Sequence, residues 1–357
     1  MKLGEILERI QPIDPAWVEK ACNRTVQLAI PRRALGRLHD MAERLCGISK
    51  TLEPVVASKA FVVMAGDHGV VADGVSAFPQ EVTGEMVKNF LRGGAGINVL
   101  ARFVGAEVLV VDMGIIPDIE PPQEGNCHFR VCKVDRGTAN LARGPAMTRQ
   151  QAEQSILLGF QVASELIAAG TQLLGTGDMG IGNTTPSAAV GAALTGFEVD
   201  QMVGRGTGID DAAFRKKREI VRQALEVNRP DPKDGVDVLA KVGGFEIGGI
   251  AGCVLAGAYH RCPVVIDGFI STAGALVAQA LCPWSVDYLF AGHCSQEAGH
   301  RKMLKYLGLE PILDLRLRLG EGTGAALAMV IIEGAVRIFR EVLTFEEAGV
   351  SKNQLLK

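Results

Sequence analysis

The stretch TQLLGTGDMGIGNTTPSAAV, residues 171–190, joins a short apolar run to a helix-starting sequence through a glycine-rich turn. The apolar run is typical of a buried strand, and Gly175 to Gly180 have the spacing G-x-G-x-x-G. Thr185 precedes Pro186, which predicts a helix start where the hydroxyl caps the first turn. The stretch therefore predicts a strand, a loop and a helix whose free N–H groups face an anionic group.

Three other apolar runs also end at an acid, at Asp67, Asp112 and Asp267. Helix-like segments separate these runs, which is typical of parallel strands that are buried on both faces. Residues 128–134 and 287–293 predict two further strands, and the alternation in 128–134 suits an edge. We therefore expect an α/β fold, a Rossmann-like three-layer sandwich with a mostly parallel sheet.

The two ends of the chain have a different pattern. Residues 15–30, residues 34–48 and residues 325–342 all have helical spacing of apolar positions. We expect about 1–50 and 335–357 to form a small helical subdomain beside a large α/β core of about 51–334. Both parts would belong to one domain that covers residues 1–357.

Composition and charge limit the class of partner. The 357 residues carry 37 Lys and Arg and 40 Asp and Glu, interspersed along the chain, so the net charge of -3 does not favour nucleic acid or an anionic membrane. No apolar run approaches the roughly 20 residues of a membrane span, and the first residues predict no secretory signal. The eight cysteines form no C-x-x-C pair, which disfavours a metal site or a disulfide framework. We expect a cytoplasmic protein with small-molecule partners and no metal.

Polar residues follow the predicted strands at the points where the strands end. In open α/β sheets the ligand binds beyond the carboxyl ends of the strands, so these residues are the first candidates for a site. The alternative is that individual acids cap the next helix. The candidates are Asp67, His68, Asp112, Asp178, Asp267 and His293.

Two later glycine clusters add charged candidates. Residues 204–208, GRGTG, precede a helix that carries Arg215 and Lys217, and a glycine loop before a helix is typical of a phosphate site. In residues 318–324, RLGEGTG, Glu321 lies between two glycines. A carboxylate flanked by apolar side chains has a raised pKa and suits a general base. The alternative is that Glu321 caps the helix that follows it.

Taken together, these motifs resemble the nicotinate-nucleotide:dimethylbenzimidazole phosphoribosyltransferases of cobalamin biosynthesis. The resemblance covers nearly the whole chain, and the combination of GxGNTTP, DGVDVLAKVGG and RLGEGTGAALAM is highly specific. The matching stretches are AGDHGVVADGVSAFPQEVT at 65–83, GNTTPSAAV at 182–190, NRPDPKDGVDVLAKVGGFEIGGIAG at 228–252, VVIDGFIS at 264–271 and LGLEPILDLRLRLGEGTGAALAM at 307–329.

The resemblance implies transfer of 5-phosphoribose from nicotinate mononucleotide to a lower-ligand base, usually 5,6-dimethylbenzimidazole. The products would be nicotinate and α-ribazole 5'-phosphate. It implies no cofactor, and it implies a homodimer.

The resemblance also implies roles for individual residues. Glu321 occupies the position of the proton acceptor. The residues that match the nucleotide site are Asp178, Met179, Gly180, Ile181, Gly182, Asn183, Gly206, Thr207, Gly208, Lys217, Ser295, Arg318 and Gly320. The residues that match the base pocket are Phe78, Pro79, Met86 and Leu319. Asp178 departs from the family pattern, which often has Glu there, so a contact made by this acid would be longer or mediated by water.

Two other classes of protein are alternatives. The G-x-G-x-x-G spacing by itself also suits an NAD-type oxidoreductase, in which Glu198 or Asp200 would bind the ribose. That acid should end a second strand, and residues 197–203 are a polar, poor candidate for one. The other alternative is a non-enzymatic nucleotide-binding protein on the same fold, which the presence of Glu321 disfavours.

Overall fold

The computed structural model describes residues 1–120 and 127–351 of the chain. Its centre is a six-stranded sheet in the order β3-β2-β1-β4-β5-β6, and every neighbouring pair of strands is parallel. The predicted α/β fold is confirmed, with β3 at the predicted edge and β6 inside the predicted 287–293. The strands are β1 (Lys59–Gly66), β2 (Ala106–Gly114), β3 (His128–Val131), β4 (Leu173–Met179), β5 (Val264–Ile266) and β6 (Leu289–Ala291).

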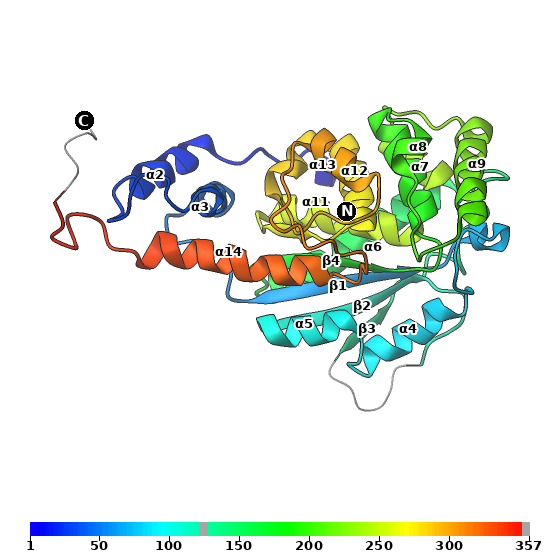
Figure 1. Ribbon diagram of the computed structural model, residues 1–357, viewed down its shortest axis with the longest axis horizontal. Coiled ribbons are helices and arrows are strands. Elements are labelled where there is room, and N and C mark those ends of the chain that lie inside the picture. The colour runs from blue at the N-terminus through cyan, green and yellow to red at the C-terminus, as the bar shows by residue number, and fades with distance from the viewer. Residues whose placement is uncertain (121–126, 352–357) are drawn as a thin grey trace.

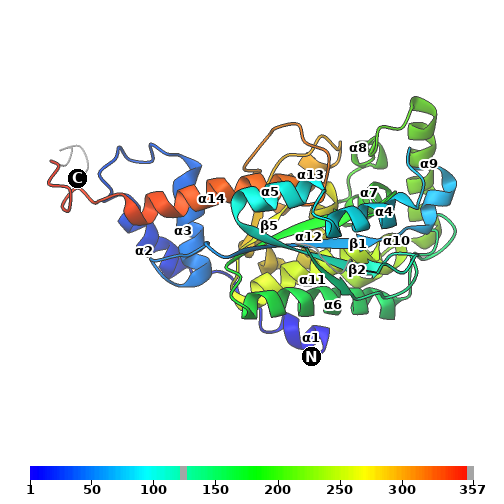
Figure 2. The same cartoon turned by 90° about the horizontal axis from the view of Figure 1, so that it is seen from below.

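Helices cover both faces of the sheet, so the molecule has three layers (Figure 1). Helices α5 and α14 lie on one face, and α6 and α11 lie on the other (Figure 2). The α-helices are α1 (Leu3–Leu7), α2 (Pro15–Thr25), α3 (Arg37–Ser49), α4 (Val82–Leu91), α5 (Gly96–Val104), α6 (Arg149–Ala168), α7 (Thr184–Thr195), α8 (Val199–Met202), α9 (Asp211–Asn228), α10 (Gly235–Val242), α11 (Phe245–His260), α12 (Phe269–Leu281), α13 (His300–Leu307) and α14 (Thr323–Glu341). Two 3₁₀ helices, η1 (Gly69–Asp73) and η2 (Pro283–Tyr288), complete the fold.

The strand order reverses direction between β1 and β4. The chain first adds β2 and β3 on one side of β1 and then adds β4, β5 and β6 on the other side. The register pairs Met64 with Asp178 and Ala65 with Met179, so β1 and β4 end at the same level. In doubly wound sheets a ligand binds in the crevice at such a switch point.

Glycines allow the two helices on one face to approach closely. A Cβ atom added to Gly159 of α6 would lie 2.0 Å from the carbonyl oxygen of Gly249 in α11. A Cβ atom on Gly252 of α11 would lie 2.1 Å from the carbonyl oxygen of Ile156. Since real Cβ atoms do not approach backbone this closely, larger residues at these positions would force the helices apart. The glycine-rich sequence of α11 therefore serves packing.

Helices α2 and α3 lie beside the C-terminal part of α14, at the end of the molecule that is away from most of the sheet (Figure 1). Arg24 joins them: its Nε donates to the Phe339 carbonyl oxygen at 3.3 Å. Leu28 and Thr344 form an isolated antiparallel bridge. Helix α1 lies elsewhere, where Arg9 donates to the Tyr259 hydroxyl at 2.9 Å, at the end of α11. The predicted subdomain with bounds 1–50 and 335–357 stays a prediction.

Within the described residues, every helix is too short or too polar to span a bilayer.

Candidate active site

A cavity of about 710 Å³ opens at the carboxyl edge of the sheet. Its walls come from the loops that follow β1, β4, β5 and β6, together with the loop that precedes α14. This is the position that the strand order predicts for a ligand. The wall segments fall within 75–86, 178–184, 206–207, 268–270, 293–297 and 316–321.

Most of the residues predicted for the site line this one cavity. Those that line it are Phe78, Met86, Asp178, Met179, Gly180, Ile181, Gly182, Asn183, Gly206, Thr207, Ser295, Arg318, Leu319, Gly320 and Glu321. Pro79, Gly208 and Lys217 do not belong to its wall. Lys217 lies behind the wall, fully buried, and its Nζ donates to Thr184 Oγ1 at 2.6 Å. Burial lowers the pKa of Lys217 to about 8.

Glu321 sits on a backbone turn that three successive residues make with positive φ. Gly320, Glu321 and Gly322 have φ of 84°, 65° and 106°. A residue with a Cβ is costly in this conformation, and the two flanking glycines make the turn possible. The turn leaves the Glu321 side chain 5% exposed at the cavity wall.

The Glu321 carboxylate faces the start of α5. Its Oε2 accepts a hydrogen bond from the Ile97 N–H at 3.0 Å. Burial raises the pKa of Glu321, and the Ile97 N–H lowers it in part. A carboxylate with a raised pKa at the wall of a cavity is suited to accept a proton.

The alternative role of Glu321 as the cap of α14 is wrong, because Asp267 has that role. The Asp267 carboxylate accepts from the N–H groups of Gly322, Gly324 and Ala325 at 3.2, 2.7 and 3.0 Å. Asp267 follows β5 directly, so a strand-end acid fixes the start of the helix that carries Glu321. Its carboxylate also lies 3.7 Å from His293 Nε2, and His293 lines the cavity.

Asp178 is the second-last residue of β4, lines the cavity and is 5% exposed. Its Oδ2 accepts from Asn183 Nδ2 at 3.0 Å, and its Oδ1 is buried without a hydrogen-bond partner among the described residues. Burial raises the pKa of Asp178 well above its usual range, and the nearby carboxylates of Asp267, Glu246 and Glu321 raise it further.

The other strand-end candidates hold neighbouring loops and do not line the cavity. Asp67 Oδ2 accepts from the Ile116 N–H at 2.8 Å, and Asp112 Oδ1 accepts from the Ile115 N–H at 2.8 Å. His68 Nε2 lies 2.9 Å from Glu246 Oε1, and both side chains are fully buried. The hydrogen-bond partners of Asp67 and Asp112 lie in the loop after β2, so the alternative of helix capping is wrong for these two acids.

The predicted helix start at Thr185-Pro186 is correct in place but wrong in detail. Helix α7 begins at Thr184, and no side chain caps it. The Thr185 hydroxyl is buried and has no hydrogen-bond partner within the described residues. The Thr184 hydroxyl instead accepts from Lys217. Asn183 is the N-cap residue of α7, and its side-chain amide donates to Asp178.

A dinucleotide site needs a second strand that ends at an acid, and the segment 197–203 does not form one. Residues 199–202 form the short helix α8, and Glu198 is its N-cap residue. Asp200 pairs on the surface with Arg222 at 2.6 Å. Neither acid ends a strand, so the interpretation of Glu198 or Asp200 as a ribose-binding acid is wrong.

Sequence reasoning missed Glu297, which lines the cavity and is 9% exposed. Its Oε1 accepts from the Gly206 N–H at 3.0 Å. Arg318 Nη1 donates to the Gly206 carbonyl oxygen at 3.4 Å, and the Thr207 hydroxyl accepts from the Ala77 N–H at 3.0 Å. The signal was available, because Glu297 follows the predicted strand 287–293 by only a few residues.

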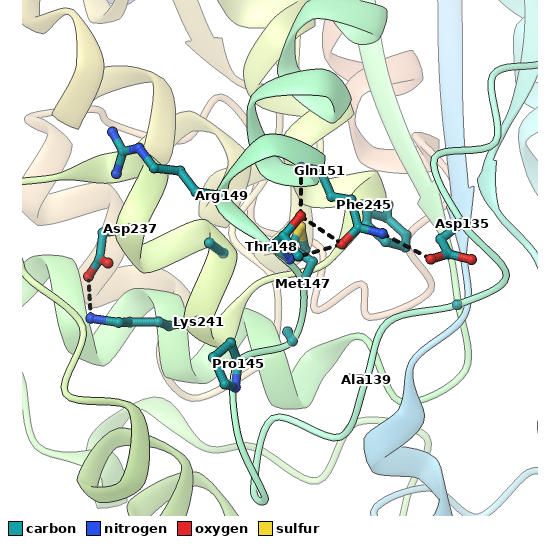
Figure 3. A pocket seen from close by; sticks show the side chains of 13 residues that line it. Asp135, Ala139, Pro145, Met147, Thr148, Arg149, Gln151, Asp237, Lys241 and Phe245 are labelled. Carbon is teal, nitrogen blue, oxygen red and sulfur yellow. Dashed lines mark hydrogen bonds and ion pairs between the residues drawn. The ribbon is translucent and has the colours of Figure 1, made fainter.

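A second cavity, of about 510 Å³, lies between the start of α6, helix α10 and the loop that contains Ala139 and Pro145 (Figure 3). The charged side chains around it already have partners. Lys241 Nζ lies 2.8 Å from Asp237 Oδ2, and Asp135 accepts from Gln151 Nε2 at 2.9 Å. Arg149 pairs with Asp234 at 2.6 Å. This cavity offers a ligand fewer unpaired polar groups than the larger one does.

A doubly wound parallel sheet with glycine loops, a buried lysine and buried acids around a cavity at its switch point is typical of a nucleotide-binding α/β protein. The family model described as phosphoribosyltransferase matches residues 10–350. The chain belongs to this family, and the family predicted from the sequence is confirmed.

Curated relatives match along the whole chain. The nicotinate-nucleotide–dimethylbenzimidazole phosphoribosyltransferase of Geobacter metallireducens is 56% identical over 353 residues, which covers 99% of each chain. The protein of the same name from Geotalea uraniireducens is 54% identical over 352 residues, again 99% of each chain. A solved structure of the enzyme from Thermus thermophilus has a TM-score of 0.89 and 48% identity, and the match covers 96% of this chain and 100% of that one.

Proposed function

We propose that the protein transfers 5-phosphoribose from nicotinate mononucleotide to 5,6-dimethylbenzimidazole or a related base, with release of nicotinate. The product is α-ribazole 5'-phosphate, and the reaction serves the assembly of the nucleotide loop of cobalamin. The observation that carries the proposal is the position of Glu321, a buried carboxylate with a raised pKa, at the wall of a cavity lined by the glycine loop 178–183.

The reaction needs one base and no general acid. The ring nitrogen of the donor is already quaternised, so the C1'–N bond breaks with its electron pair going to that nitrogen, and nicotinate leaves with a neutral ring nitrogen. One nitrogen of the benzimidazole forms the new bond to C1' from the opposite face, which inverts the anomeric carbon from β to α. The other nitrogen loses its proton to the Glu321 carboxylate.

The cavity wall supports the binding of a mononucleotide. Loop 178–183 presents backbone groups between β4 and α7, and the glycines leave room for close approach. Gly206, Thr207 and Arg318 line a second part of the wall, with Lys217 behind it. We propose that this second part takes the phosphate, since it holds the two cations. Ser295 and Gly320, which also line the cavity, would contact the phosphate or the ribose.

Phe78, Met86 and Leu319 line the same cavity as Glu321, and we propose that they hold the flat base. Phe78 is 51% exposed and Leu319 is 61% exposed, so a bound heterocycle would cover apolar surface that is open to solvent in the structure. Pro79 would shape the backbone behind Phe78.

We further propose that the protein is a cytoplasmic homodimer. Exposed apolar side chains on two helices that pack against each other, α5 and α14, support an interface between copies. Val99 and Phe103 on α5 are 53% and 70% exposed, and Val330 on α14 is 42% exposed. Sedimentation of Phe103→Glu against the unaltered protein tests this face, since a charge on an apolar interface should produce monomers.

A direct assay tests the proposed reaction. The protein is mixed with nicotinate mononucleotide and 5,6-dimethylbenzimidazole, and products are identified by mass and by the configuration at C1'. Free nicotinate and the α-nucleotide are expected in equal amounts. Thermal shift gives an independent check: nicotinate mononucleotide should stabilise the protein, and NAD should do so much less. The absence of both products would overturn the proposal.

A further inference from the structure

Glu297 places an acid in the part of the cavity where the proposed function needs to bind an anion. It follows β6, and its side chain reaches the 204–208 loop. Its Oε1 accepts from the Gly206 N–H at 3.0 Å, and its Oε2 is buried without a hydrogen-bond partner among the described residues. A buried carboxylate oxygen without a partner is costly, so this arrangement requires an explanation.

Two cations face Glu297 from two other elements. Lys217 of α9 lies against the Gly206 backbone, since a Cβ atom on Gly206 would be 3.1 Å from Lys217 Nζ. Arg318, in the loop before α14, donates to the Gly206 carbonyl oxygen at 3.4 Å. Burial raises the pKa of Glu297, and Lys217 and Arg318 lower it in part.

His300, at the start of α13, is another titratable neighbour of Glu297, and its backbone N–H donates to the Glu297 carbonyl oxygen at 3.0 Å. Its Nδ1 accepts from the Ser295 N–H at 2.8 Å, and its Nε2 lies 2.9 Å from the Thr272 hydroxyl. Burial lowers the pKa of His300 to about 3. Two cations and one carboxylate therefore surround Gly206.

We define the phosphate subsite as Gly206, Lys217, Glu297 and Arg318. We propose that the Glu297 carboxylate competes with anions for this subsite, and we call this competition the gate. In the structure the Glu297 carboxylate accepts a hydrogen bond from the Gly206 N–H, and its negative charge offsets the positive charge of Lys217. A phosphate that binds to this N–H must first displace the carboxylate. The inference rests on the proposed function, because it assumes that the subsite takes the phosphate of a nucleotide.

The gate has a consequence for specificity. With Glu297 ionised, the two cations leave one net positive charge for a phosphate that carries about two negative charges. Inorganic phosphate contacts only the phosphate subsite. These contacts alone must offset the repulsion between phosphate and the Glu297 carboxylate. A nucleotide adds the contacts of its ribose and its ring, and these offset the displacement of the carboxylate. Glu297 thus weakens the binding of inorganic phosphate more than it weakens the binding of a nucleotide, which makes the site selective for the nucleotide.

The test uses inorganic phosphate as the probe and titration calorimetry as the measurement. Glu297→Gln keeps an oxygen that can accept from Gly206 and removes the charge. We expect this variant to bind inorganic phosphate at least ~10-fold more tightly than the unaltered protein, since a unit charge within several Å changes binding by that much or more. The matched control is Glu226→Gln, an exposed position on α9, which should leave phosphate binding unchanged. Unchanged or weaker phosphate binding in Glu297→Gln overturns the gate.

A second measurement keeps the proposal testable if Glu297→Gln does not fold. The structure of the unaltered protein with nicotinate mononucleotide should show the Gly206 N–H donating to a phosphate oxygen and Glu297 turned away. A nucleotide complex in which Glu297 still accepts from Gly206 overturns the gate. Neither measurement depends on turnover. A protein that binds phosphate as expected but forms no α-nucleotide would contradict only the proposed reaction.

Discussion

The loops before α7 and α14 bring two acids to one cavity and surround them differently. Asp178 has an amide partner on one oxygen, no partner on the other among the described residues, and three carboxylates nearby. Glu321 has the N–H of Ile97 at the start of α5, and the nearby Asp267 carboxylate raises its pKa. The comparison shows that burial alone does not define a proton acceptor. Burial raises the pKa of both acids, and the three nearby carboxylates raise the pKa of Asp178 further.

The largest expected effect is that of Glu321→Gln. The variant keeps the shape of the side chain and removes the proton acceptor, so kcat should fall by about 10³-fold. The dissociation constant for nicotinate mononucleotide should change by less than about threefold, measured by calorimetry in the same preparation. A kcat within tenfold of the unaltered protein would mean that another group takes the proton.

The pH dependence of kcat/KM is a second test of Glu321 as the proton acceptor. Glu321 must be ionised to accept a proton, and burial raises its pKa. Activity should therefore fall on the acid side at a pH above the ordinary pKa of a glutamic acid, by about tenfold for each unit below the midpoint. The measurement is the pH profile of kcat/KM for nicotinate mononucleotide at a saturating concentration of 5,6-dimethylbenzimidazole. A midpoint at or below the ordinary value would contradict the raised pKa.

Asp267→Ala tests the loop that carries Glu321, because the Asp267 carboxylate caps α14. Loss of the cap should cost about 1–2 kcal/mol of the free energy of unfolding and loosen the turn that carries Glu321. We expect kcat to fall by ~10- to 100-fold, with folding followed by circular dichroism. Asp267→Asn should recover part of both losses, since its amide oxygen still accepts.

Asp178→Asn tests the other side of the comparison. Because the pKa of Asp178 is raised on folding, the acid favours the folded state only while it is protonated, and this contribution is lost as pH rises through the raised pKa. An amide mimics the protonated acid and does not titrate. We expect kcat within about tenfold of the unaltered enzyme and a Tm higher by about 2 °C at pH 8.

At a pH near the ordinary pKa of aspartic acid, the difference in Tm between Asp178→Asn and the unaltered protein should vanish. A lower Tm for the variant at pH 8 would show that Asp178 is ionised in the folded protein. A loss of kcat as large as that of Glu321→Gln would make the two acids equivalent.

The smallest expected effect is that of Phe78→Ala, on the base side of the cavity. Phe78 is half exposed in the structure, so the variant should fold as before. The KM for the base should rise by ~3- to 10-fold, since a ring contact with a flat heterocycle is worth about 1 kcal/mol. The KM for nicotinate mononucleotide should stay the same. Equal changes in both would place Phe78 outside the base pocket.

The sequence predicted four of the six strands because each is a short apolar run that ends at an acid, a pattern typical of buried parallel strands. It predicted most of the cavity wall because the glycine loops lie next to strand ends. It did not predict the exact partners. Whether an acid caps the next helix or a distant one depends on packing between elements, as Asp267 and α14 illustrate. Glu297 was missed because its significance lies in its contact with Gly206, 91 positions earlier.

Helix α14 has a mechanical consequence for the enzyme. It runs over 19 residues, or about 28 Å at 1.5 Å per residue, from the turn that holds Glu321 to Glu341. Its far end is fastened to the first part of the chain by Arg24. A rod of this length converts a small tilt at one end into a displacement at the other. The position of the Glu321 carboxylate is thereby tied to segments that do not line the cavity.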